Sequence, residues 1–189
     1  WLSFAVSEKM EKFKFSASEE LRLDENFSHI NKVFTELGAD YEIVKGLSAG
    51  FSYRFSRDND YPERAYDIRH RIDLGIEYQH EINDLELSIK NKFQTKTGNS
   101  DDNNPTYNRT KLGAEYKFSD LVKPFVTYEF FYQMNDERII NRTRTSIGNK
   151  LKLSGNSDLK IFYIFENRFN TKNLAHNHIW GVSYSLDLN

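Results

Sequence analysis

Apolar and polar residues alternate strictly along this chain, and one alternating segment recurs with its glycine and tyrosine in fixed positions. The three clearest copies are LGADYEI (Leu37–Ile43), LGIEYQH (Leu74–His80) and LGAEYKF (Leu112–Phe118). Weaker copies are FAVSEKM (Phe4–Met10), IGNKLKL (Ile147–Leu153) and WGVSYSL (Trp180–Leu186). A period of two predicts half-buried β-strands, and helical spacing fits none of the copies.

A second alternating segment lies between successive copies, so each repeat predicts a pair of strands. These partner segments are Phe13–Leu23, Leu47–Phe55, Leu85–Phe93, Pro124–Tyr132 and Leu159–Phe165. The two sets together give eleven predicted strands. Most of them are long enough to cross a bilayer when tilted.

The connections between these segments alternate in length. Tight turns follow the glycine–tyrosine strands, near Met10 and at Val44–Gly46, His80–Asp84, Ser119–Lys123 and Ser154–Asp158. Longer polar loops follow the partner strands, for example Ser56–Ala65 and Thr95–Tyr107. This asymmetry is typical of bacterial outer-membrane barrels, whose periplasmic turns are short. We therefore expect an all-β fold, a transmembrane antiparallel up-and-down β-barrel of 10–12 strands, formed by a single domain over residues 1–189.

The two ends of the chain qualify this expectation. Eleven strands are an odd number, so either one more strand lies upstream of Trp1, giving the favoured count of twelve, or the first segment pairs irregularly. No signal peptide is visible, so any export signal has already been removed. The chain ends at Leu188–Asn189 rather than in the aromatic residue of many such barrels, and Tyr184 and Leu186 keep the alternation of a variant last strand.

Composition helps to decide which face of the strands meets lipid. The mean hydropathy is −0.72, and no apolar run reaches the roughly 18–20 residues of a spanning helix, so an α-helical membrane protein is excluded. Ten to twelve strands lined inside by apolar residues would enclose a large void. We therefore expect the apolar face to point outward into lipid, with a soluble lipocalin-like binder or β-sandwich as the remote alternative.

Tyrosines on the apolar register mark one membrane boundary. Tyr41, Tyr78 and Tyr116 each lie shortly before a tight turn, so they predict a periplasmic aromatic row. Glu19 is the anomaly, because unbroken alternation places its carboxylate on the lipid face. A bulge at Glu19–Glu20 would rotate it inward, and contact with another protein is the second possibility.

The opposite register is densely ionic and predicts a charge network facing the lumen. Its members are Asp67, Arg69, Arg71, Asp73, Glu77, Lys90, Glu115, Glu129, Arg142, Arg144, Glu166 and Arg168. The signs are close to balanced, which suits interlocking ion pairs or a wet, weakly selective pore, whereas a selective pore usually carries a one-sided ring. The net charge of −2 gives no reason to expect a nucleic-acid partner.

Sites for chemistry are scarce. The chain has no cysteine, and the His176–His178 pair, which we place in the last long loop, lacks a third metal ligand. His70 lies on the apolar register, so we expect it to be an interfacial residue rather than a catalyst. Ser183 and Ser185 are expected to point inward, and no Ser–His–acid set lies together in the sequence. We expect no catalytic residue, no cofactor and no metal site.

Two segments carry a resemblance to a known family. WLSFAVSEKMEKFKFSASEELRL (Trp1–Leu23) and IRHRIDLGIEYQ (Ile68–Gln79) resemble the Bacteroidetes-type small outer-membrane barrels grouped as domain of unknown function 2490, and the similarity runs over the whole chain. The resemblance implies a barrel in the bacterial outer membrane and carries over no catalytic residue.

The function we expect is that of a non-enzymatic outer-membrane barrel, a structural or accessory subunit of a larger envelope complex. A small passive pore and a lipid-modifying hydrolase are the alternatives. The expected partners are outer-membrane lipid and, for the accessory role, other outer-membrane or periplasmic proteins.

Overall fold

The computed structural model describes residues 1–24, 27–60, 65–98, 104–135, 138–153, 156–170 and 174–188, and these residues form one closed sheet of eleven strands. The strands are β1 (Leu2–Met10), β2 (Phe13–Asp24), β3 (His29–Val44), β4 (Leu47–Asp60), β5 (Ala65–Ile82), β6 (Leu85–Gly98), β7 (Tyr107–Tyr116), β8 (Val122–Gln133), β9 (Ile140–Lys152), β10 (Ser157–Arg168) and β11 (Ala175–Asp187). No helix among these residues is long and apolar enough to cross a membrane.

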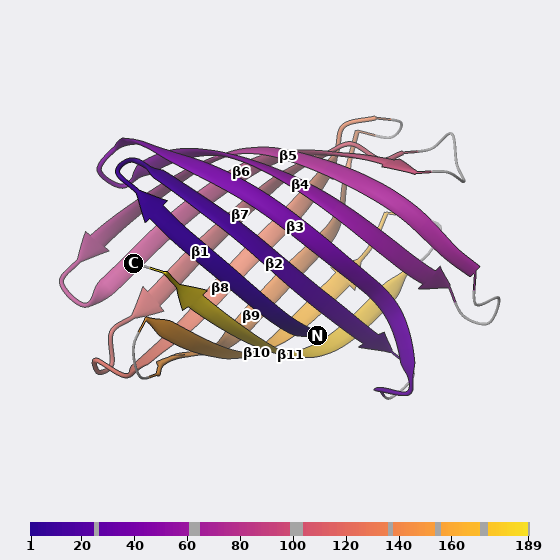
Figure 1. Cartoon of the computed structure of the whole chain (residues 1–189). Helices are drawn as coiled ribbons and strands as arrows, with labels where there is room; N and C mark the ends of the chain where they lie inside the picture. The colour runs from indigo at the N-terminus through magenta and orange to yellow at the C-terminus, as the bar shows by residue number, and fades with distance from the viewer. Residues whose placement is uncertain are drawn as a thin grey trace.

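The barrel closes through one parallel pair, as Figure 1 shows for β1 beside β11. Leu2 to Ser7 pair with Val182 to Asp187 in the same direction, whereas all other neighbouring strands are antiparallel. An odd number of alternating strands leaves the first and last running the same way, so they can only meet in parallel. The all-β barrel is confirmed, and of the two predicted solutions for the odd count the irregular pairing of the first segment is observed, not the favoured twelfth strand.

The tight turns gather at one end of the barrel, on the left in Figure 1. Two-residue turns at 11–12, 45–46 and 83–84 follow β1, β3 and β5 as predicted. At the other end, the predicted loop Ser56–Ala65 is wrong in extent, since β4 continues to Asp60 and β5 begins at Ala65. Cross-strand ion pairs from Asp58 to Lys32 (2.6 Å) and Arg69 (3.6 Å) join β3, β4 and β5 there. The predicted turn Ser154–Asp158 lies partly outside the described residues, and β10 begins at Ser157.

The barrel is inverted relative to a soluble protein. Leu37, Ile76 and Trp180 are 53%, 57% and 64% exposed on the outer wall. The largest fully buried side chains of the described residues are the carboxylates Asp73 and Glu166, each 1% exposed. The expectation that apolar residues face outward is therefore confirmed, and the charged register fills the interior.

Aromatic rings inside the barrel rest on glycines of neighbouring strands. Phe162 covers Gly181, where an added Cβ would lie 2.2 Å from the ring. Phe125 covers Gly148, where an added Cβ would meet the ring at 2.8 Å and the Ile161 carbonyl oxygen at 2.3 Å. These inward glycines leave room for bulky lumen side chains, as their register predicts.

Glu19 stays on the outer wall. The pairing of β2 with β3 is regular from Phe13 to Arg22, and the register shifts only between Arg22 and Leu23. A bulge at Glu19–Glu20 is therefore the wrong explanation. The Glu19 carboxylate is exposed and accepts a hydrogen bond from the Thr35 hydroxyl on β3, which satisfies one lone pair without turning the charge inward.

Candidate functional site: the charged lumen

Every residue of the predicted charge network takes part in an ion pair inside the barrel. The pairs are Arg69–Asp67 (3.0 Å), Arg71–Asp73 (2.9 Å), Lys90–Glu77 (2.6 Å), Lys123–Glu115 (3.6 Å), Arg109–Glu129 (2.7 Å), Arg144–Glu166 (2.5 Å), Arg168–Glu166 (2.9 Å) and Arg142–Glu166 (3.8 Å). Alternation along a strand brings an arginine and a carboxylate at i and i+2 together, and the sheet register joins the remaining pairs across strands.

Two carboxylates, the buried Glu166 and the half-buried Glu36, organise this network. Glu166 on β10 binds Arg144 and Arg142 of β9 and Arg168 of its own strand. It also accepts a hydrogen bond from the Asn177 amide at 3.1 Å. A carboxylate with almost no water access is stabilised only by such donors, so Glu166 fixes β9, β10 and β11 to one another.

The second centre was missed by the sequence analysis. Glu36 on β3 pairs with Arg54 of β4 (2.6 Å) and Arg71 of β5 (2.8 Å), and Arg71 in turn binds Asp73. Glu36 shares the inward register of Gly38, which was the available signal. Its pairing with Arg71, two strands away, depends on the stagger of three strands, which alternation alone does not give.

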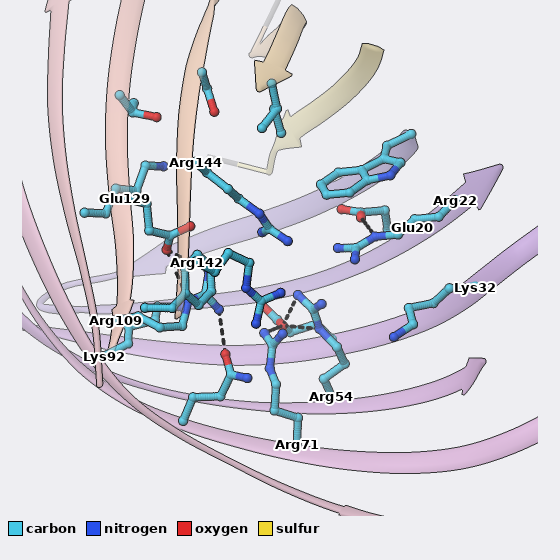
Figure 2. Close-up of a pocket in the computed structure, with 18 of the residues that line it drawn as sticks. Glu20, Arg22, Lys32, Arg54, Arg71, Lys92, Arg109, Glu129, Arg142 and Arg144 are labelled. Atoms are coloured by element: carbon cyan, nitrogen blue, oxygen red, sulfur yellow. Dashed lines mark hydrogen bonds and ion pairs between the residues drawn. The ribbon is translucent and has the colours of Figure 1, made fainter. Parts of the chain in front are cut away.

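A cavity of about 390 Å³, which we call the cationic chamber, lies in the barrel toward the end opposite the tight turns. Thirteen lysines and arginines line it against three glutamates, Glu20, Glu36 and Glu129. Figure 2 shows Arg54 of β4, Arg71 of β5, Arg109 of β7 and Arg142 and Arg144 of β9 converging on this common space. The near-balance of charge expected for the whole lumen therefore does not hold locally.

Two further cavities continue from the chamber toward the tight turns. The middle cavity, about 210 Å³, shares Glu36, Lys90 and Lys92 with the chamber, and its wall carries four carboxylates and two lysines. The turn-end cavity, about 700 Å³, shares Asp40, Ser48, Glu77 and Lys90 with the middle one. Five lysines and five carboxylates line this last cavity. The polar interior thus runs from a cationic half to a balanced half.

Aromatic side chains lie on the outer wall at two levels along the barrel. Tyr41, Tyr78 and Tyr116 are 40%, 46% and 48% exposed near the tight turns, where the sequence placed the periplasmic row. A second group, which the sequence analysis did not identify, lies nearer the other end and pairs tyrosines with histidines. Tyr53 contacts His70 Nδ1 through its hydroxyl at 2.6 Å, and Tyr163 contacts His178 Nδ1 at 2.6 Å.

The histidine pair lies in strand rather than in loop. β11 begins at Ala175, so His176 and His178 are strand residues, and the predicted loop position is wrong. Both are exposed and pack against Phe165, His176 in a stacked arrangement at 6.0 Å between centroids. Within the described ranges no group of three or more His, Cys, Asp or Glu side chains is arranged to hold a metal ion.

Comparison with known proteins gives a family and a fold. A profile of the family described as Protein of unknown function (DUF2490) matches residues 1–177. A search of curated proteins finds no match. The in-vitro folded trimer form of OmpT, an outer membrane protein of Vibrio cholerae, superposes with a TM-score of 0.50 at 13% identity, covering 90% of this chain and 57% of that one.

A second solved structure gives a lower score. The anion-selective porin from Comamonas acidovorans superposes with a TM-score of 0.46 at 14% identity, covering 94% of this chain and 52% of that one. The chain thus spans between about half and three fifths of the length of these two structures. At such identities, the likeness to OmpT concerns the barrel fold alone.

Proposed function

This chain belongs to the family described as Protein of unknown function (DUF2490), and from the geometry of its lumen we propose that it is a passive pore for small polar solutes in the bacterial outer membrane. The barrel fold and the exposed apolar wall support the membrane location. The proposal assigns no catalytic step, and the outward His70 and His178 bind tyrosine hydroxyls rather than a nucleophile.

The observation that carries the proposal is the succession of adjoining polar cavities along the barrel. The chamber, the middle cavity and the turn-end cavity share wall residues, with Lys90 common to all three. Most side chains at these walls are charged or hydroxylic, so water and small ions can replace each other along the path. An interior that served only to hold the barrel together would be expected to fill such space with packed side chains.

The middle cavity is the expected constriction. It is the smallest of the three cavities, and the Glu36–Arg54, Glu36–Arg71 and Asp73–Lys92 pairs lie at its boundary with the chamber. Because ion pairs across a narrow lumen restrict passage without sealing it, we expect a small unitary conductance.

Recording in planar bilayers tests the proposal, and the chain offers a matched pair of positions for it. The sequence has no cysteine, so a single Ser52→Cys on the wall of the middle cavity is the one thiol of the protein. Ala49→Cys on the same strand lies on the outward register and is the control. A charged, membrane-impermeant thiol reagent is expected to reduce the current through Ser52→Cys and to leave that of Ala49→Cys unchanged.

Absence of a stable conductance from the pure, folded barrel would contradict the pore. A conductance that the reagent alters equally in both variants would place the current outside the lumen, which also overturns the proposal.

The outward carboxylate of Glu19 favours a second candidate, the accessory subunit. A charge on the lipid face costs stability, and contact with another protein would relieve it. In isolated lipid vesicles, Glu19→Leu is expected to stabilise the barrel by about 1 kcal/mol. If the accessory role is correct, the same change reduces recovery of a co-purifying partner from native membranes, whereas Thr35→Val, which removes only the hydrogen-bond donor, does so less.

A further inference from the structure

The cationic chamber holds more positive charge than its carboxylates can neutralise. Beyond Glu20, Glu36 and Glu129 in the wall, five carboxylates reach lining cations from neighbouring positions: Asp58, Asp67, Asp73, Glu77 and Glu166. Among the described residues, eight carboxylates that line the chamber or pair with its cations therefore face thirteen lysines and arginines. The surplus is held inside a partly enclosed space with protein walls, where like charges repel more strongly than in bulk water.

The surplus is concentrated on three lysines. Lys96 on β6, Lys111 on β7 and Lys160 on β10 line the chamber, and none of the three has an ion-pair carboxylate within the part of the chain that the structure describes. Lys96 lies among like charges, with Lys32, Arg71 and Arg142 as electrostatic neighbours. The arginines of the chamber, by contrast, are mostly held in pairs. Among the described residues these three ammonium groups have no direct ion pair, and Asp58, Glu129 and Glu115 attract them only from beyond ion-pair distance.

The aromatic faces of the chamber are already occupied. The ammonium of Lys160 lies 4.1 Å from the Phe125 ring centroid, and the guanidinium carbon atoms of Arg109 and Arg142 lie 4.6 Å and 4.2 Å from Phe131. Arg22 covers the Trp1 ring at 3.9 Å. A cation therefore lies over each of these rings, and ammonium and guanidinium groups are the most numerous donors offered to a solute, beside the hydroxyls of Ser56, Thr127 and Ser146.

We propose that the chamber is a binding site for a small multivalent anion carrying phosphate groups, held chiefly by Lys96, Lys111 and Lys160. Ammonium groups bind phosphate oxygens as point charges. The planar guanidinium groups of the surrounding arginines add N–H donors that can form hydrogen bonds to the same oxygens. A monovalent ion cannot neutralise several surplus charges at once, whereas pyrophosphate or a small organic phosphate can. This inference rests on the proposed pore, since the anion reaches the chamber through the lumen.

Trp1 offers a direct readout. The chain contains two tryptophans, Trp1 in the chamber wall and Trp180 on the outer wall. Trp180→Phe leaves Trp1 as the single reporter, and its emission is expected to change and saturate when pyrophosphate is added to the folded barrel in detergent. Sodium chloride at equal ionic strength is expected to give no saturating change.

The decisive variant replaces Lys96, Lys111 and Lys160 together by glutamine in the Trp180→Phe background. Because the substitutions remove like-charge repulsion rather than a paired charge, the barrel is expected to fold, which heat-modifiable migration verifies. Pyrophosphate binding is expected to weaken at least tenfold. The matched control replaces Lys12 and Lys14, which line the turn-end cavity, and is expected to keep its affinity.

Each outcome separates the two proposals. Equal affinity in the triple variant and the control, or the same response to chloride as to pyrophosphate, overturns the anion site. A response of Trp1 to vesicles of phosphatidylglycerol, but not of phosphatidylcholine, without added pyrophosphate would assign the phosphate chemistry to lipid headgroups and overturn a soluble ligand. Retained pyrophosphate binding without any bilayer conductance supports the site and contradicts the pore.

Discussion

The two halves of the lumen hold similar side chains under different constraints. At the cationic chamber, the shortest ion pairs are buried, as in Arg144–Glu166 at 2.5 Å and Arg71–Asp73 at 2.9 Å. In the turn-end half, the side chains of Lys150–Asp158 (3.5 Å) and Lys9–Glu42 (3.1 Å) are more than one third exposed, whereas Lys90–Glu77 (2.6 Å), shared with the middle cavity, is less exposed. The same charges are therefore structural in one half and largely solvated in the other.

The two halves of the lumen are expected to differ in what they contribute to barrel stability and to solute binding. A buried pair that loses one partner leaves an uncompensated charge, whereas an exposed pair loses little. The chamber both fixes the barrel, through Glu166 and Asp73, and keeps lysines without carboxylates for a solute. The turn-end half contributes little to barrel stability or to solute binding. Substitutions in the chamber half are therefore expected to have larger effects than substitutions in the turn-end half.

The largest effect is expected at Glu166. Glu166→Gln leaves Arg142, Arg144 and Arg168 without their shared carboxylate, which is expected to lower the free energy of unfolding by about 3 kcal/mol. Urea unfolding of the barrel in lipid vesicles measures it. Glu115→Gln, which breaks the 3.6 Å pair with Lys123, is the control and is expected to cost less than about 1 kcal/mol. Equal losses in the two variants would remove the distinction between the halves.

A smaller effect is expected at the aromatic wall of the chamber. Gly148→Ala forces a methyl group against the Ile161 carbonyl and the Phe125 ring, so the barrel is expected to lose about 1–2 kcal/mol by the same urea measurement. Gly75→Ala in the middle cavity meets its nearest neighbours only at 3.1 Å and 3.2 Å, and is expected to cost less. The reverse order would show that Phe125 does not depend on Gly148 for its position.

The smallest effect is expected outside the lumen, in the turn between β7 and β8. Lys117 donates a hydrogen bond to Asp120 across 2.8 Å, which holds the pKa of the Asp120 carboxyl below its usual value. The pair therefore contributes above the unfolded pKa of Asp120, and that contribution is lost as the pH falls through the folded pKa. Because both groups are fully exposed, Asp120→Asn is expected to leave the urea midpoint unchanged between pH 3 and pH 7.

Strand alternation was enough to predict the fold, and it divided the side chains of each strand between two registers. Arg71 and Asp73 were placed inward from their spacing to Gly75, and Tyr41 outward from the apolar register. The position of a residue along the barrel axis was not predictable in this way, because it depends on the stagger between strands. For that reason Glu36 was not predicted as the partner of Arg71. For the same reason, the nearly equal numbers of positive and negative residues in the sequence did not reveal that the positive ones gather in one chamber.

The sequence anticipated the parallel closure of the barrel and the outward position of Glu19 for different reasons. The odd strand count already required either an added strand or an irregular pair, so β1–β11 was one of two predicted outcomes. Glu19 lies on the outward register that the alternation predicts. The bulge, one of the two explanations for a carboxylate on the lipid face, is absent there. The hydrogen bond that Glu19 accepts from Thr35 offers partial compensation that a single-strand pattern does not reveal.

The central claim is that lipid covers the apolar wall while charged side chains enclose a wet interior. Quenching of tryptophan emission by brominated phosphatidylcholine tests it most directly, using Trp1→Phe, which retains Trp180, and Trp180→Phe, which retains Trp1. The account predicts strong quenching of Trp180, which is 64% exposed on the outer wall, and weak quenching of Trp1 in the chamber wall. Strong quenching of Trp1 with Trp180 unaffected would contradict it.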